Sequence, residues 1–200
     1  KGWVLGETLI TGIGQGYTQT TPIQLCLMTA QIANGGYKIT PKILTDDNQL
    51  TSEQVKKAMQ DSKLNDLYQP LYDDQKNIRI VQEAMFSSTN EIMGTSYKSR
   101  IDDLKYQFAG KTGTAQVKRI SKRERELDLK TFQIPYEERD HALYIAFGPY
   151  RSPRYAVSII VEHGGSGSST AAPMATELFK LIVDRHQYRK KIPDYKEFSI

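Results

Sequence analysis

The sequence contains little cysteine and no long apolar run. Cys26 is the only cysteine among 200 residues, which excludes an internal disulfide. No apolar stretch reaches the roughly 18 residues needed to cross a membrane, and no apolar leader stands at Lys1. With 38% hydrophobic and 25% charged residues, the composition is typical of a globular chain. We expect one domain, or part of one, taken from a longer protein.

Histidine is also scarce. His141, His163 and His186 are far apart in the sequence, and Cys26 has no neighbouring ligand, so no zinc site is predicted. We expect no metal and no cofactor. The adjacency of Asp140 and His141 in the sequence does not by itself indicate a Ser-His-Asp triad, although sequence order does not rule one out.

Positive charge is in moderate excess, with a formal net charge of +4 and a pI near 9.0. Basic residues cluster at 118–125 and 185–191. The first cluster is mixed with acidic residues, and the second follows a predicted helix whose C-terminal dipole favours cations. A nucleic-acid interface would need aromatics interleaved with such clusters on one face. A solvated loop and a helix end explain the two clusters better, so no nucleic acid partner is predicted. A basic domain that binds anionic surfaces is a weaker alternative.

Two helix starts are clearly signalled. Thr21 can cap a helix, Pro22 suits its first position, and Gln24 completes a capping box. The Asn-Gly-Gly sequence at 34–36 ends this helix. Asp74 is predicted to cap a second helix that ends near residue 94.

Strand patterns occupy much of the second half. Strands are predicted at 107–117, 141–147 and 155–161, and a last helix at 170–186. Further expectations are a short edge strand at 37–44, a short helix after Thr51, a turn at 95–100, a charged excursion at 118–140, and tight turns in the glycine-rich opening at 3–17.

The stretch 107–117 carries the chemistry. Lys111 supplies a fixed ammonium, and Thr112 and Thr114 supply hydroxyls that can hold a carboxylate. Gly113 has no Cβ, so an acyl group can lie close to the backbone. The Thr114 N–H is then available to a developing oxyanion.

Three other motifs fail on single residues. A P-loop at Gly110-Lys111-Thr112 would need glycine at Lys105. A dinucleotide fingerprint beginning at Gly12 would need glycine at Tyr17. A nucleophile elbow around Ser166 would need glycine at Ser168.

Three segments carry a resemblance to a known family. Residues 109–116, Ala-Gly-Lys-Thr-Gly-Thr-Ala-Gln, resemble the third active-site motif of penicillin-binding proteins, the D,D-transpeptidases that cross-link peptidoglycan. Residues 12–24 are similar to a G-x-G-Q-G-x-x-x-x-T-P-x-Q stretch of that family. Residues 139–149 resemble the strand entry of its elongation-specific class B branch, penicillin-binding protein 2. The likeness covers roughly residues 1–185.

The resemblance implies an α+β fold: an antiparallel sheet covered by helices, of the penicillin-binding transpeptidase (serine β-lactamase-like) type. It also implies that residues 1–200 are the C-terminal portion of one transpeptidase domain, with a core at about 1–187 and a basic tail at 188–200. Two of the five strands of the family's sheet come earlier in such proteins. We therefore expect three strands here, with an exposed edge.

The implied reaction is serine acyl transfer between stem peptides, with β-lactams as inhibitors. Lys111 and the Thr114 N–H would act in catalysis, and Thr112, Gly113 and Thr114 would bind substrate. Gly164 and Gly165 would lie at the rim of the cleft, although a flexible connector is an equal interpretation. The family further implies partners in the elongation machinery, a membrane glycosyltransferase and scaffold proteins, at the periplasmic face of the inner membrane.

The nucleophile of that mechanism is missing. No serine begins an S-x-x-K motif, so the serine and its lysine base are expected upstream of Lys1. Ser88-Thr89-Asn90 matches S-x-N formally, but Ser88 is interpreted as a helix terminus. The alternative function is a non-catalytic fragment or interaction module that is inactive on its own.

Overall fold

The structure, a computed structural model, describes residues 2–41, 70–118 and 129–190. Its helices and strands, in chain order, are α1 (Leu5–Gly12), α2 (Pro22–Ala33), α5 (Gln75–Asn90), β1 (Ala109–Ala115), β2 (His141–Gly148), β3 (Tyr155–Val161) and α7 (Ala172–Lys190). A five-residue π-helical turn, η4 (Gly167–Ala171), precedes α7. None of these helices is long and apolar enough to cross a membrane.

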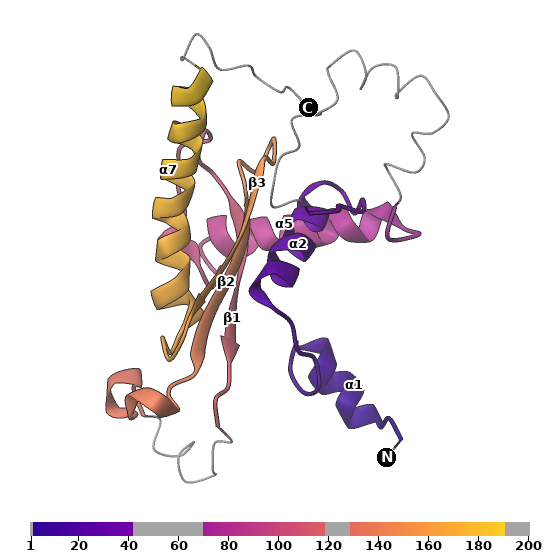
Figure 1. Ribbon diagram of the computed structural model, residues 1–200, viewed down its shortest axis with the longest axis vertical. Coiled ribbons are helices and arrows are strands. Elements are labelled where there is room, and N and C mark those ends of the chain that lie inside the picture. Colours follow the sequence, from indigo (N-terminus) through magenta and orange to yellow (C-terminus); the bar gives the residue numbers. More distant parts are fainter. Residues whose placement is uncertain (1, 42–69, 119–128, 191–200) are drawn as a thin grey trace.

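The three strands form one antiparallel sheet in the order β1-β2-β3. Lys111 of β1 lies opposite Ile145 of β2, and Thr112 lies opposite Tyr144. Figure 1 shows α7 along one face of the sheet and α2 and α5 against the other. The predicted α+β class, the three strands and the helical cover on both faces are confirmed. In the described part of the chain, β1 has one strand neighbour and one open edge.

Each face of the sheet has its own core. On the α7 side, Phe108, Tyr144 and Phe179 are fully buried, and the rings of Phe108 and Phe179 stack with centroids 4.8 Å apart. On the other side, Met85 of α5 packs with Ala109 and Phe147. The alternation of buried side chains along β2 follows from the period of two residues in a strand.

The predicted helix starts are confirmed. The Thr21 hydroxyl accepts from the Gln24 N–H at 3.3 Å, and the Gln24 side chain accepts from the Thr21 N–H at 2.8 Å. The Asp74 carboxylate accepts from the Lys76 N–H at 2.9 Å. Capping is local chemistry between residues two or three apart, so the sequence predicts it well.

Four predictions about helices and strands differ from the structure, the first being the end of α5, which lies at Asn90 and not near residue 94. The opening contains helix α1, where the glycines had indicated tight turns; only Gly6 lies in the interior of this helix. Tight turns do follow at Gly14 and Gly16, both with positive φ. Of the edge strand expected at 37–44, the described residues 37–41 form only one bridge, between Tyr37 and Pro70; residues 42–44 lie outside the described part of the chain. Helix α7 continues to Lys190.

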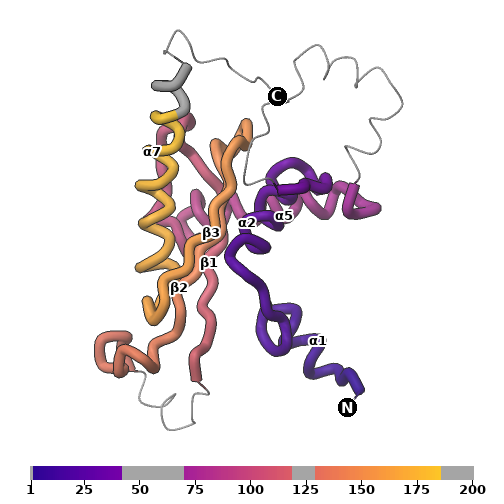
Figure 2. Tube along the Cα trace, viewed as in Figure 1, coloured from indigo at the N-terminus to yellow at the C-terminus, as the bar shows by residue number. Residues whose placement is uncertain are grey.

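Helix α1 extends away from the sheet, as the tube in Figure 2 shows, and contributes no buried residue. The predicted helix after Thr51, most of the basic cluster at 118–125 and the end of the basic tail lie outside the described residues. The proposed division into a core at 1–187 and a tail stays a prediction.

Candidate active site

The open edge of β1 presents the backbone of alternate residues. The Gly110 N–H donates to the Thr89 hydroxyl at 3.0 Å, and the Thr112 carbonyl accepts from the Lys111 ammonium at 2.9 Å. Both contacts are made on the side away from β2. In a strand, the N–H and C=O of one residue point to the same side, and that side alternates along the chain. The Thr114 N–H is therefore directed to the same open edge.

The side chains of a predicted catalytic residue, Lys111, and a predicted substrate-binding residue, Thr112, converge at this edge. The Lys111 ammonium lies 3.4 Å from the Thr112 hydroxyl, in addition to its bond to the Thr112 carbonyl. Lys111 is exposed and Thr112 is half-buried, so a ligand can reach both. An ammonium and a hydroxyl side by side are suited to holding a carboxylate through charge-assisted hydrogen bonds.

The Thr112 hydroxyl has a further partner that the sequence did not indicate. It lies 3.1 Å from the hydroxyl of Thr95, which comes from the turn between α5 and β1. Thr95 in turn lies 3.3 Å from the hydroxyl of Ser88. Ser88 is in the last turn of α5, as predicted for a helix terminus. The structure thus connects Ser88 to the Lys-Thr-Gly strand through an intermediate residue.

Gly113 is explained first by packing. It lies opposite Leu143, and a Cβ on Gly113 would stand 3.3 Å from the Leu143 Cβ. Gly167 of η4 is tighter, since a Cβ there would stand 2.5 Å from the Gly113 carbonyl oxygen. Close contact of η4 with the β1–β2 ladder therefore requires little bulk at either residue. Access of an acyl group to the Gly113 backbone stays a prediction.

A buried hydroxyl network supports the start of β1. The Tyr144 hydroxyl lies 2.9 Å from the Thr89 hydroxyl and 3.0 Å from the Ser96 hydroxyl, and all three residues are buried. Burial raises the pKa of Tyr144 above its usual value, so the phenol stays neutral. A Cβ on Gly110 would collide with the Tyr144 hydroxyl. Gly110 is therefore needed beside Lys111 for a steric reason.

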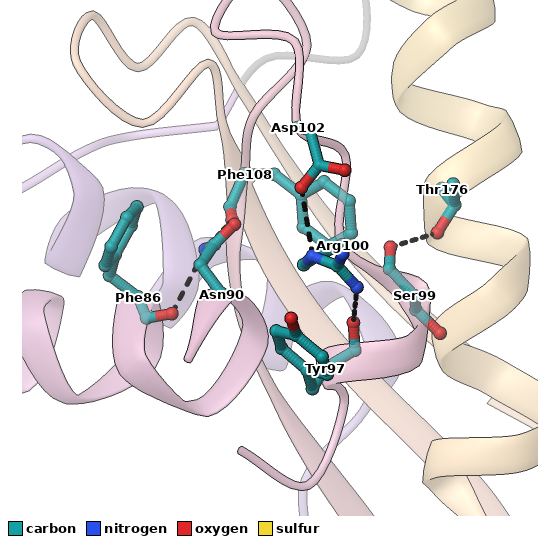
Figure 3. Close-up of polar contacts among 8 residues, drawn as sticks. All are labelled: Phe86, Asn90, Tyr97, Ser99, Arg100, Asp102, Phe108 and Thr176. Carbon is teal, nitrogen blue, oxygen red and sulfur yellow. Dashed lines mark hydrogen bonds and ion pairs between the residues drawn. The ribbon is translucent and has the colours of Figure 1, made fainter. Parts of the chain in front are cut away.

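The segment between α5 and β1 is tied down at both ends. Figure 3 shows the Asn90 side-chain amide, which donates to the carbonyls of Phe86 and Phe108 at 3.0 and 2.9 Å. It also shows the Thr176 hydroxyl of α7 donating to the Ser99 carbonyl at 2.5 Å. These bonds fix the turn that carries Thr95 relative to the sheet.

The Gly164–Gly165 turn lies at the end of the sheet where β1 finishes, since His141 of β2 pairs with Ala115. The Gly165 N–H donates to the Asp140 carbonyl at 2.8 Å, and its φ of +80° favours glycine. The Gly164 carbonyl accepts from the Thr170 hydroxyl at 2.9 Å. The turn is thus held on both sides. Its place at the rim of a cleft stays a prediction.

The two neighbouring histidines interact with each other. The Nδ1 atom of His141 accepts from the His163 N–H at 2.9 Å, and their ring centroids are 4.8 Å apart. His163 has a positive φ of 54°, which this hydrogen bond supports. Within the described residues, no group of three or more metal-ligating side chains is assembled.

Comparison with known proteins gives a consistent result. Residues 1–180 match the family model described as Transpeptidase, penicillin binding protein transpeptidase domain. The chain is 30% identical to the peptidoglycan D,D-transpeptidase MrdA of Haemophilus influenzae, over 99% of this chain and 28% of that protein.

Two solved structures are similar over most of the chain. One is the penicillin-binding protein (PBP2) of Helicobacter pylori in complex with MreC, with a TM-score of 0.63 and 30% identity over 96% of this chain and 29% of that chain. The other is PBP2 of Pseudomonas aeruginosa in complex with WCK 5153, with a TM-score of 0.62 and 33% identity over 93% of this chain and 34% of that chain. The chain therefore spans about a third or less of the length of these proteins.

Proposed function

This chain belongs to the penicillin-binding protein transpeptidase family, of the PBP2/MrdA type, and from that premise we propose that the protein containing it is a peptidoglycan D,D-transpeptidase. The observation that carries the proposal is the convergence of the Lys111 ammonium and the Thr112 hydroxyl at the open edge of β1. Both groups lie beside backbone N–H and C=O groups that no strand of the described chain covers.

The stem peptide of peptidoglycan, or a β-lactam, would bind along β1 as an added strand. The outward backbone groups of Thr112 and Thr114 would pair with it, which is the usual basis of β-strand addition. The hydroxyls of Thr112 and Thr114 and the charge of Lys111 would hold the substrate carboxylate. Gly113 and the Gly164–Gly165 turn would line the rest of the binding surface.

The reaction would be acyl transfer through a serine outside this chain. The serine oxygen would attack the carbonyl carbon of the penultimate D-alanine, and the oxyanion formed would accept from the Thr114 N–H. Collapse would expel the terminal D-alanine as an amine, after protonation, and leave an acyl-serine. An amine of a second stem peptide would then attack the ester and release the serine. Removing an oxyanion donor costs about 2.7–4 kcal/mol in other enzymes.

Lys111 would act electrostatically. It would stabilise the bound carboxylate and orient the groups that relay the proton from the serine. Replacement of Lys111 by alanine in the longer protein should abolish acylation by benzylpenicillin while thermal unfolding stays unchanged, because the side chain is exposed. Wild-type acylation rates in that variant would contradict the role.

The absence of an S-x-x-K motif from the 200 residues favours a second candidate function for the chain on its own. By itself it would be an inactive fragment or interaction module that supplies one wall of the site. The wider setting follows the family: β-lactams as inhibitors, the periplasmic face of the inner membrane, and a scaffold protein such as the MreC bound by the Helicobacter pylori relative. A membrane glycosyltransferase would be a further partner.

A further inference from the structure

Three hydroxyls from separate parts of the chain form a row that ends at Thr112. Ser88 comes from α5, Thr95 from the following turn, and Thr112 from β1. The oxygen atoms are 3.3 Å apart between Ser88 and Thr95, and 3.1 Å apart between Thr95 and Thr112. Beyond them, the Lys111 ammonium lies 3.4 Å from the Thr112 hydroxyl oxygen. The row therefore lies directly behind the proposed carboxylate site.

The donor and acceptor inventory restricts how this row can be arranged. A threonine hydroxyl has one hydrogen to donate and two lone pairs, whereas an ammonium only donates. Lys111 therefore uses one lone pair of Thr112. If Thr95 donates to Thr112, the second lone pair is filled and the Thr112 hydrogen is directed outward. If Thr112 instead donates to Thr95, its hydrogen is lost to an incoming anion. A carboxylate, which only accepts, selects the first arrangement.

Ser88 influences the direction of the hydrogen bond between Thr95 and Thr112. When Ser88 donates to Thr95, the Thr95 hydrogen is left to donate to Thr112. All hydrogens in the row then point toward the anion, and hydrogen bonds aligned in this way strengthen one another. Ser88 needs no nucleophilic role to account for its position.

The turn that carries Thr95 is clamped onto the end of α5. The N–H and the hydroxyl of Ser96 both donate to the Ser88 carbonyl at 3.0 Å. A Cβ on Gly94 would collide with the same carbonyl oxygen. Thr95 is consequently fixed opposite Ser88 by its neighbours, while its own side chain remains exposed to solvent.

We propose that Thr95, supported by Ser88, is a positioning residue that sets the Thr112 hydroxyl as a hydrogen-bond donor to the substrate carboxylate. This role rests on the proposed transpeptidase function. It assigns Thr95 to the binding machinery through Thr112 and not through direct contact with the reacting atoms.

The test is a double-mutant cycle in the longer protein that contains this chain, with benzylpenicillin as the probe. The measured quantity is the second-order rate constant of acylation. Thr95→Val keeps the shape of the side chain and removes the hydroxyl, and should lower the rate about tenfold, as expected for one weakened hydrogen bond to a charged ligand. Thr95→Ser restores the hydroxyl and should restore the rate. In a Thr112→Val background, Thr95→Val should have no further effect.

A matched pair tests the end of the row. Ser88→Ala should lower the rate less than Thr95→Val does. Ser87→Ala should leave it unchanged, because the Ser87 hydroxyl donates to the Glu91 carboxylate at 2.9 Å and takes no part in the row.

Each result decides the matter. A wild-type rate in Thr95→Val overturns the positioning role. An equal loss in both Thr112 backgrounds also overturns it, because a defect in folding or packing would act without Thr112. If the unaltered longer protein is not acylated by benzylpenicillin at all, the transpeptidase function fails and this role fails with it.

Discussion

The hydroxyl of Tyr144 lies 2.9 Å from the hydroxyl of Thr89, and neither residue is exposed to solvent. This contact joins the central strand to the last turn of α5, directly behind Gly110. Since Gly110 precedes Lys111, the network sets where the proposed catalytic strand begins.

Removal of the Tyr144 hydroxyl should therefore destabilise the fold. In Tyr144→Phe, the Thr89 and Ser96 hydroxyls each lose a buried partner, and a buried polar group left short of partners costs about 1–3 kcal/mol. We expect the lower part of that range, because Thr89 keeps its contact with the Gly110 N–H. Urea unfolding of both proteins measures the difference. Equal midpoints would show that the network contributes no stability.

Gly110→Ala should destabilise the chain through a steric conflict. The new Cβ would overlap the hydroxyl end of Tyr144, and overpacking of this kind costs about 1–3 kcal/mol. Tyr144→Leu removes the obstructing atoms, so the double variant should be more stable than the sum of the two single effects predicts. Strict additivity of the unfolding free energies would contradict the conflict.

The link between α7 and the loop before β1 should respond to pH. Asp184 accepts from the Lys105 ammonium at 2.8 Å and from the Tyr106 hydroxyl at 2.7 Å. These bonds, Lys105 first, lower the pKa of Asp184 below its usual 3.8, and the bond to Asp184 raises the pKa of Lys105 above 10.5. Asp184 is exposed and Lys105 and Tyr106 are only half-buried, so solvent screens the ion pair and the effect is small.

The sign of that pH dependence follows from linkage. A lowered carboxyl pKa stabilises the fold above pH 3.8, and the benefit is lost as pH falls through the folded-state pKa. A raised lysine pKa stabilises the fold below pH 10.5 and is lost as pH rises through the folded-state value. Asp184→Asn should therefore lower stability near neutral pH and match the wild type in strong acid. Urea unfolding of both proteins at several pH values checks this. A difference in unfolding free energy that stays the same from neutral pH to strong acid would contradict it.

Local signals predicted much of the fold. The capping box of Thr21 with Gln24 and the cap at Asp74 depend on residues two or three apart, and the apolar runs at 141–147 and 155–161 indicated β2 and β3. Helix α1 was not predicted because the glycines of this segment indicate turns, whereas its start is supported by one local contact, the Glu7 side chain accepting from the Val4 N–H at 3.2 Å. Propensity alone cannot decide such cases.

The site also combines residues that are close in the sequence, which could be predicted, with contacts between distant residues, which could not. Lys111, Thr112 and Thr114 stand together in the sequence, so their chemistry was visible without a structure. Thr95 and Thr112 are 17 residues apart, and Thr89 and Tyr144 are 55 apart. No spacing rule connects hydroxyls over such separations, and only the packing of α5 and its turn against β1 brings them together.

The most direct test of the account is the intact mass of this chain after incubation with benzylpenicillin, beside a longer chain from the same gene that extends upstream. We predict that only the longer chain gains the mass of the drug, because under the proposed function the reactive serine would lie upstream and residues 109–115 would supply the opposite wall. A gain of mass by this chain alone would contradict the account, because one of its own serines would then be the nucleophile.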